Sequence, residues 1–518
     1  MTALRLGIDF GTTRTVVAAA HDGRYPVAAF DDGEAFREYV PGVAALVRGE
    51  LVVGWDAARA LAAGEADHAI RSIKRAAAAL APDAPVPGLP GVTALALVTT
   101  FLAELRTAIV AHSNLPGARG AGPIEAMVSV PANAASRQRW LTLEAFRRAG
   151  FAPIGMLNEP TAAAIEFAHR HLAELGPRSP KRYVVVYDLG GGTFDASAVS
   201  LVGRQFDLIA TEGLARVGGD DFDEIILAAA CEAAGLPVAT DAAALERARE
   251  AKEALRPASK RIVVELEDGA GSPQTVQLDV ADIYARCAPL IKRTLAQTET
   301  LFARLREAGI TPDGERGGDG RRAATDSEDT RALGGVYLVG GAAAFPAVSR
   351  ALRARFGKKL QLAPQPFAAT AIGLALAADP AASVLVREAV TRHFGVWREG
   401  QGGADKVFDS LIGKDAEAGI VRRRYRPAHT VGHLHFVECG ALDADGQPVQ
   451  DLVPLGEVVF PYAGDLSAAA AAGAPVERSD LRDEIAETYT YASDGSISVR
   501  IENLSRGYAR EFELGALR

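Results

Sequence analysis

Two glycine-rich turns flanked by aspartates contain the residues of this chain that are most able to do chemistry. In one of them, the apolar run 184–187 is followed by Asp188, by glycines at 190–192 and by Asp195. Glycines let a ligand approach the backbone closely, and successive backbone N–H groups in such a turn form a concavity that binds anions. The two carboxylates beside it suit a hydrated divalent cation. Taken alone, the segment is equally well explained as a β-hairpin with a glycine-rich turn.

A second turn of the same design lies near the N-terminus. The apolar run 6–8 precedes Asp9 and Gly11, and Thr12 and Thr13 then add hydroxyl donors. Two strand–Asp–Gly–Thr turns about 180 residues apart could hold a polyphosphate from opposite sides, so the pair favours a phosphate site over a simple hairpin. No segment of the sequence matches the GxxxxGKS or GxxxxGKT pattern, which excludes a P-loop.

A glycine pair marks a third candidate turn. The strand-like run 334–339 ends at Gly340 and Gly341, and a helix is expected to begin near Phe345 and Pro346, because proline suits the first turn of a helix. Such a strand–glycine–helix junction can hold a nucleoside, although the pattern alone is common.

The composition indicates an ordinary globular protein of two to four domains, with 518 residues, 48% of them hydrophobic and 23% charged. The net charge of −9 argues against a nucleic-acid partner, which would need a basic face. Three distant cysteines without CxxC spacing exclude a disulfide framework and fit a reducing compartment. No uninterrupted apolar stretch reaches membrane-spanning length, and the N-terminus lacks a signal-peptide pattern. We therefore expect a cytoplasmic protein with no membrane partner.

The order of patterns along the chain predicts two folded parts. Residues 1–378 alternate strand-like and helix-like segments, which is typical of an α/β domain, and the polar, glycine-rich stretch 312–333 is expected to be a disordered insert. Residues 379–393 form a linker. In 394–518, strand-like runs separated by Gly, Asp and Pro turns predict a small all-β domain of the sandwich type, with a hairpin turn at Ser493–Gly495.

The three turns, in this order, resemble the actin–hexokinase–heat-shock ATPase superfamily. Within it, four segments resemble the heat-shock protein 70 (DnaK-type) chaperone family: SIKRA from Ser72, SVPANAASRQR from Ser129, MLNEPTAAAIEFA from Met156 and VGGDDFDEII from Val217. The resemblance covers about the first 378 residues. It implies an actin-like ATPase domain, built on a ribonuclease H-like repeat, whose central cleft binds ATP or ADP with Mg2+.

The resemblance also implies roles for individual residues. Lys74 would stabilise the charge of the transferring phosphoryl group, and Glu159 would orient a magnesium-bound water or the attacking water. Asp188 and Thr193 complete the catalytic set, and Asp9 and Asp188 would hold Mg2+ through water. The nucleotide-binding residues implied are Asp9, Gly11, Thr12, Thr13, Arg14, Gly190, Gly191, Gly192, Gly218, Gly219, Lys252, Arg256, Gly340, Gly341 and Ala342.

Some positions depart from the family pattern on the adenosine side. Arg249 and Arg256 stand where the family has Glu and Ser, Ala342–Ala344 replace polar residues, and Phe367 replaces an acidic residue. Weaker or different contacts to adenine and ribose, and hence a lower nucleotide affinity, are the expected result.

The parts that would couple nucleotide to partner are also altered. Pro131 and Arg139 match a family pair that relays nucleotide state to the partner domain, but Arg387 and Glu388 interrupt the usually apolar connector. The β part resembles the family's substrate-binding sandwich only faintly. Since the sequence stops at Arg518, about where that sandwich ends, the resemblance implies a member without the helical lid.

The leading interpretation is a DnaK-like, slowly ATP-hydrolysing chaperone-type protein whose nucleotide state controls binding of a protein client or partner by the β domain. A J-domain co-chaperone and a nucleotide exchange factor are the further partners that the resemblance implies. The alternative is a non-catalytic ATP-binding regulatory or exchange-factor-like module, which the altered adenosine side favours and the complete catalytic set opposes. An actin-like filament or a small-molecule kinase is opposed by the NEPTAAA segment and by the trailing β part.

Three histidines form one further cluster. On a strand, His433 and His435 would share a face, with His429 nearby, and histidine is a common metal ligand. No cysteine or carboxylate stands at ligand spacing beside them. The sequence therefore favours a solvated or hydrogen-bonded strand face over a metal site.

Overall fold

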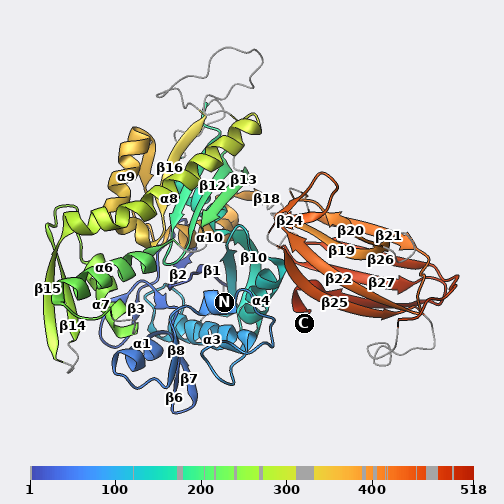
Figure 1. Cartoon of the computed structure of the whole chain (residues 1–518), viewed down its shortest axis with the longest axis horizontal. Coiled ribbons are helices and arrows are strands. Elements are labelled where there is room, and N and C mark those ends of the chain that lie inside the picture. The colour runs from blue at the N-terminus through green and yellow to red at the C-terminus, as the bar shows by residue number, and fades with distance from the viewer. Residues whose placement is uncertain are drawn as a thin grey trace. The chain divides into compact units, whose positions relative to one another are not determined.

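The computed structural model describes most of the chain, and these residues fold into two compact units (Figure 1). Met1–Lys74, Glu104–Ser129 and Leu157–Val386 form the first unit, and Arg75–Ala103, Val130–Met156 and Arg387–Arg518 form the second. The domain boundaries expected at 378 and 394 remain predictions. The described residues are 3–120, 122–171, 179–202, 205–214, 217–238, 242–267, 272–310, 332–387, 392–400, 405–414, 416, 418–450, 452–462, 476–492 and 495–517.

Two sheets of the α/β part repeat one strand arrangement. In the sheet of order β10-β9-β1-β2-β5, β1 (Leu4–Phe10) pairs antiparallel with β2 (Arg14–Ala19) and parallel with β9 (Ile124–Val130). In the sheet of order β17-β16-β11-β12-β13-β18, β11 pairs antiparallel with β12 and parallel with β16. Each predicted phosphate turn therefore joins the first two strands of one copy. The remaining strands are β5 (Val40–Pro41), β10 (Ala152–Asn158), β11 (Tyr183–Leu189), β12 (Phe194–Ser200), β13 (Gln205–Leu214), β16 (Leu333–Val339), β17 (Leu360–Leu362) and β18 (Leu385–Arg387).

Two helices pack closely in the core of the first unit. They are α5 (Glu159–Arg170) and α10 (Ala369–Ala378), and both are rich in alanine. A Cβ placed on Gly373 of α10 would lie 1.8 Å from the carbonyl oxygen of Ala162 in α5. The two backbones therefore touch, which buries almost all of α10 and fixes the start of α5, where Glu159 stands.

Further elements surround these sheets in the part of the chain before β18. They confirm the mixed α/β class expected for residues 1–378. They are β3 (Phe30–Asp31), β4 (Phe36–Arg37), β6 (Ala44–Val47), β7 (Glu50–Val53), α1 (Gly54–Ala62), β8 (His68–Ile70), α2 (Ile73–Ala77), α3 (Ala94–His112), α4 (Ser136–Arg148), α6 (Gly219–Ala234), α7 (Ala242–Glu253), β14 (Arg261–Glu267), β15 (Pro273–Asp279), α8 (Val280–Glu307) and α9 (Pro346–Phe356).

Helix α3 is the one described helix that is long and apolar enough to cross a membrane by length and composition. Glu104 and Arg106 interrupt its apolar sequence, so it is not the kind of uninterrupted apolar stretch that the sequence excludes. Half of the helix is buried inside the protein, with Leu97, Phe101 and Leu105 fully buried. The core helix of a soluble protein passes the same test, so a single helix of this kind is weak support for a membrane span.

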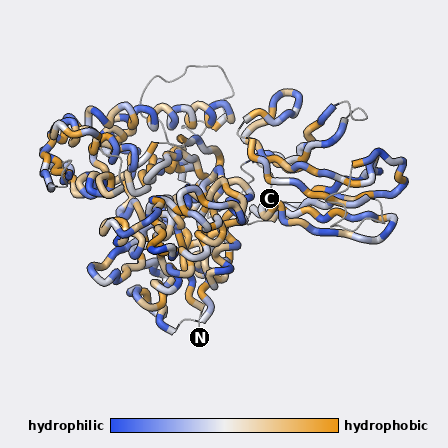
Figure 2. The backbone as a smooth tube through the Cα atoms, turned by 60° about the horizontal axis from the view of Figure 1, so that its bottom comes forward, coloured by the Kyte–Doolittle hydropathy of each residue, from blue (hydrophilic) through white to orange (hydrophobic). Residues whose placement is uncertain are grey.

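The all-β part consists of two four-stranded antiparallel sheets, of order β20-β19-β22-β25 and β21-β26-β27-β28. One apolar core joins them, with Phe394 and Phe436 from the first sheet and Tyr489 and Ile501 from the second. Hydrophilic and hydrophobic residues alternate along these strands (Figure 2), as expected where one face is buried. The strands are β19 (His393–Gly400), β20 (Asp405–Ile412), β21 (Gly419–Tyr425), β22 (Val431–Cys439), β25 (Val453–Pro461), β26 (Ile485–Tyr491), β27 (Ile497–Asn503) and β28 (Tyr508–Glu513), with a separate small pair β23 (Ala441–Leu442) and β24 (Pro448–Gln450).

Several local predictions can be compared with this fold. The hairpin of β26 and β27 is confirmed by the pairing of Tyr491 with Ile497, while Ser493 and Asp494 of its turn lie outside the described residues. The predicted insert 312–333 also lies outside them, except for its last two residues. Of those, Leu333 was wrongly assigned to the insert, because it begins the buried strand β16.

Candidate functional site

Four carboxylates and one lysine meet in the first unit. Asp9 ends β1, Asp188 and Asp195 face each other across the β11–β12 hairpin, and Glu159 begins α5. Lys74, on the short helix α2, is buried and forms an ion pair with Glu159. Segments that are far apart in the sequence thus place three of the predicted catalytic side chains and both predicted magnesium ligands in one cluster.

Burial and mutual repulsion raise the pKa values of Asp9, Asp188 and Asp195. Burial, with Glu159 as the next cause, raises the pKa of Asp9 to about 6 and that of Asp195 to about 7. The pKa of Asp188 lies well above its usual value because of burial and then of its acidic neighbours, while Lys74 opposes all three shifts. The Ser129 hydroxyl donates a hydrogen bond of 2.9 Å to Asp9 Oδ1.

The donor set of this cluster fits a magnesium ion. Mg2+ prefers carboxylate oxygens and retains several of its waters. Four carboxylates with one lysine leave an excess of negative charge, and a divalent cation would remove the repulsion that raises the pKa values. Asp9 and Asp188 are the residues that would hold the ion through water.

Stabilisation by magnesium should increase between about pH 6 and pH 7. A carboxyl whose folded-state pKa is raised stabilises the fold below its unfolded pKa of about 3.8, and this stability is lost as the pH rises through the folded values near 6 and 7. Mg2+ needs the ionised carboxylates, so its affinity should rise over the same window.

Melting temperatures with and without MgCl2, compared at pH 5.5 and pH 8, measure this effect. The increase in melting temperature caused by Mg2+ should be larger at pH 8 than at pH 5.5. In the Asp195→Asn variant, this increase should depend less on pH near pH 7. An increase that is equal at both pH values would contradict the assignment of the raised pKa values.

The two predicted phosphate turns lie against each other. A Cβ on Gly191 would be 1.8 Å from the hydroxyl oxygen of Thr13, so the second turn touches the first. The second turn is closed by a hydrogen bond of 3.0 Å from Gly190 N to Thr193 O. A phosphate chain between these turns would meet backbone N–H groups and hydroxyls from both sides.

The segment around Gly218 lies against the second turn and forms a third side of the candidate phosphate site. Gly219 N donates to Gly190 O at 2.9 Å, and a Cβ on Gly218 would be 2.6 Å from Gly192 N. Lys252 of α7 is buried and donates to Gly219 O at 2.8 Å. Gly218 and Gly219 thus lie against the second turn, together with Lys252.

The glycine pair of the third turn also reaches this cluster. Gly340 has a φ of +91°, and a Cβ there would lie 2.4 Å from Asp188 Oδ1, so the position requires glycine. Gly341 has open space where a Cβ would be, and Ala342 lies 3.5 Å from the Cβ position of Gly219. Helix α9 begins at Pro346, as predicted.

Comparison with known proteins gives the family. Residues 120–390, more than half of the chain, match the sequence model of a family described as "Hsp70 protein". The chain belongs to the Hsp70 family. Its relatives include proteins named "Chaperone protein HscA homolog" from Bordetella pertussis, Burkholderia mallei strain SAVP1 and Chromobacterium violaceum, which are 34%, 35% and 33% identical over 391, 402 and 397 residues. Each comparison covers 73% of this chain and 58% of the relative, so the chain spans less than two thirds of these relatives.

Two arginines among the predicted nucleotide-binding residues bind other protein groups. Arg14 donates to Glu253 of α7 at 2.6 Å and stacks on Tyr39. Arg256 donates to the carbonyls of Glu253 and Leu255, just after the end of α7. Nucleotide contacts by Arg14 and Arg256 remain predictions.

Two site residues were not among those predicted. Ser129 donates to Asp9, and Asp223 pairs with Lys252 Nζ at 2.6 Å. Both contacts join segments that no local pattern relates. Asp195, which the sequence placed with Asp188 beside a cation site, faces Asp188 in the strand register.

The β part contains a second candidate site, a cavity of about 1250 Å3. Its lining includes more cationic than acidic side chains, with Glu399, Asp405 and Asp409 as the acids. The cations are Arg398, Lys406, Arg423, Arg424, Arg426 and Arg478.

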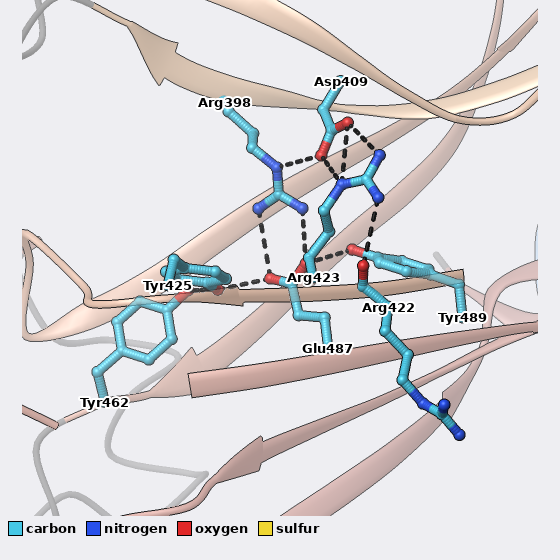
Figure 3. A network of polar contacts seen from close by, with 8 residues as sticks. All are labelled: Arg398, Asp409, Arg422, Arg423, Tyr425, Tyr462, Glu487 and Tyr489. Atoms are coloured by element: carbon cyan, nitrogen blue, oxygen red, sulfur yellow. Dashed lines mark hydrogen bonds and ion pairs between the residues drawn. The ribbon is translucent and has the colours of Figure 1, made fainter. Parts of the chain in front are cut away.

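Beside this cavity, a polar network joins the two sheets (Figure 3). Glu487 on β26 is completely buried and accepts hydrogen bonds from Arg398, Tyr425 and Tyr489 at 2.6, 2.5 and 2.6 Å. Asp409 on β20 binds Arg398 and Arg423, at 2.8 and 2.9 Å. Removing one member of such a network would leave a buried charge without its partner, so we interpret the network as holding the sheets, and with them the cavity, in place.

Proposed function

We propose that this chain is a DnaK-like protein that binds ATP with Mg2+, hydrolyses it slowly in the cytoplasm, and uses its nucleotide state to control a protein partner. The observation that carries the proposal is the meeting of Lys74 and Glu159 with three aspartates beside two phosphate turns in contact. Membership of the Hsp70 family agrees with this proposal. Three buried free cysteines fit a reducing compartment.

The residues of the cluster have distinct tasks in this mechanism. Backbone N–H groups of the two turns, with the hydroxyls of Thr13 and Thr193, hold and align the phosphate chain. Lys74 stabilises the negative charge of the transferring phosphoryl group, and Glu159 orients the attacking water. A magnesium ion held by Asp9 and Asp188 would neutralise charge on the phosphates.

Partner binding is assigned to the β part, at its cationic cavity. The lining residues suit polar or acidic segments of a client more than apolar ones. Within the second unit, Arg139 is buried, and its Cδ would be 2.9 Å from a Cβ on Gly495 at the β26–β27 turn. The Pro131–Arg139 segment thus touches the β-sandwich, which supports its proposed role in relaying nucleotide state.

The connector, residues 384–390 within the predicted linker, supports the same proposal. Residues 385–387 form β18, at the edge of the sheet beside β13, so part of the connector is a docked strand. Glu388 lies outside the described residues. A nucleotide-controlled switch requires an element whose position depends both on nucleotide binding and on partner binding.

A single-turnover ATPase assay, with and without a J-domain co-chaperone, tests the proposal. Mg2+-dependent release of phosphate that the co-chaperone accelerates would support a chaperone-type ATPase. Binding of ATP without turnover would support the alternative, a regulatory or exchange-factor-like module. That alternative is favoured by the altered adenosine side, where Arg249 and Arg256 bind protein groups.

A further inference from the structure

Three side chains of kinds that bind metal ions meet on the outer face of one β-sheet. His433 and His435 of β22 are exposed and share a face, while Leu434 and Phe436 between and after them are buried. Glu457 on β25 stands directly opposite His435 in the strand register. One ligand atom from each of the three lies within 4.8 Å of the others. The sequence shows no carboxylate at ligand spacing beside the histidines, and the neighbouring strand supplies one, Glu457.

The distances within this cluster suit a shared ion. His433 Nε2 and His435 Nδ1 lie 3.1 and 3.7 Å from the same oxygen, Glu457 Oε2. Two ligand atoms, each about 2.0–2.2 Å from a tetrahedral Zn2+, would be roughly 3.3–3.6 Å apart. The longer contact exceeds the reach of a hydrogen bond, so direct pairing with Glu457 holds His435 only weakly.

We propose that His433, His435 and Glu457 bind a divalent transition-metal ion of the Zn2+ class. Imidazole together with a carboxylate suits Zn2+, Ni2+ or Cu2+, whereas Mg2+ and Ca2+ prefer oxygen ligands only. Three protein ligands leave a fourth position, which is typical of zinc sites that are not purely structural. Because both histidines also line the cavity of the β part, a water or a side chain of a bound partner could take that position.

The surrounding charges permit a bound cation. Cationic side chains of the cavity would repel it, but Arg398, Arg423 and Arg478 are each paired with a carboxylate. All three ligand side chains are about half exposed, at 40%, 53% and 51%. An ion can therefore enter, and the side chains can move by a few tenths of an ångström, without a change in the fold.

Calorimetric titration of tag-free, chelator-treated full chain with ZnCl2 tests the proposal. Excess Mg2+ in the buffer keeps carboxylate sites such as the Asp9–Asp188 cluster occupied. We expect one Zn2+ per chain in this titration. Loss of a group that only supports a ligand costs 10–100-fold in affinity, so His433→Ala and His435→Ala should each weaken binding by about 100-fold or more. Glu457→His keeps three ligands and should retain binding.

His429→Ala is the matched control. His429 pairs with a carboxylate in the same way, at 3.2 Å from Glu399, but is not part of the cluster, so its loss should leave Zn2+ affinity unchanged. Since His433 and His435 are exposed, their alanine variants should melt at the wild-type temperature without metal. Equal melting temperatures would show that a variant that no longer binds Zn2+ is still folded.

Tryptophan fluorescence locates the ion. Trp397 on β19 is the direct cross-strand neighbour of His435, so Cu2+ in the site should quench part of the emission. Trp397→Phe should remove this quenching while preserving Zn2+ binding. Binding that survives both histidine variants, or no stoichiometric binding at all, would overturn the proposal and leave an ordinary surface His–Glu pair.

Discussion

Lys74→Ala should slow single-turnover ATP hydrolysis by about 100- to 1,000-fold while ATP still binds, because one cation is removed from the transition state. Lys74 is buried and pairs with Glu159, and it is the cation that opposes the raised pKa values of Asp9, Asp188 and Asp195. Its charge therefore faces the carboxylate cluster rather than solvent. Filter-based phosphate release measures the rate, and calorimetry with ATP measures binding.

Arg75→Ala is the control for this prediction, because it removes one positive charge from the next residue of α2, which is exposed. It should hydrolyse ATP at the wild-type rate. Both variants should be assayed with saturating Mg2+, since Lys74→Ala leaves the carboxylates with more mutual repulsion. Hydrolysis by Lys74→Ala at the wild-type rate would show that the catalytic assignment is wrong, whatever its affinity for ATP.

The phosphate turns could be predicted from the sequence because the residues that shape them act locally. Glycine removes a Cβ, threonine supplies a hydroxyl, and aspartate at a strand end faces the ligand, so each turn carries its signal within about ten residues. The structure brings Thr13 and Gly191 into contact, which two turns working as a pair require. The antiparallel hairpins β1–β2 and β11–β12 have the same local origin.

Contacts between distant segments could not be predicted in this way. Lys74 stands on a helix of five residues with no pattern that separates a buried lysine from a solvated one, and only the family resemblance indicated it. Glu457 joins His435 through strand pairing, and Glu487 is bound by side chains from two other strands. Register and sheet packing decide these contacts, and neither leaves a signal in the local sequence.

The departures on the adenosine side have a physical reason in the structure. Phe367 stands where an acidic residue was expected and packs against the apolar core that contains α5 and α10. Arg249 pairs with Glu246 at 2.8 Å. Phe367 thus contributes to packing and Arg249 to ion pairing within the protein. These contacts give each departure from the family pattern a structural role that does not depend on nucleotide affinity.

Gly373→Ala should destabilise the first unit by about 3 kcal/mol or more, because the close contact of α5 and α10 leaves no room for a methyl group. The added Cβ would lie 1.8 Å from the carbonyl oxygen of Ala162 and 2.5 Å from its carbonyl carbon. Both are backbone atoms, which cannot rotate away as a side chain could. The helices must therefore move apart, and the core that they share must open.

Thermal unfolding without nucleotide measures this effect, and the melting temperature should fall by roughly 5–10 °C. Gly341→Ala is the control in the same unit, because open space surrounds its Cβ position, and it should melt within about 1 °C of the wild type. Since α5 begins at Glu159, movement of this helix should also slow hydrolysis by whatever folded protein remains. A Gly373→Ala protein that melts like the wild type would show that the two helices are farther apart than in this structure, and the position of Glu159 beside Lys74 would then need to be reconsidered.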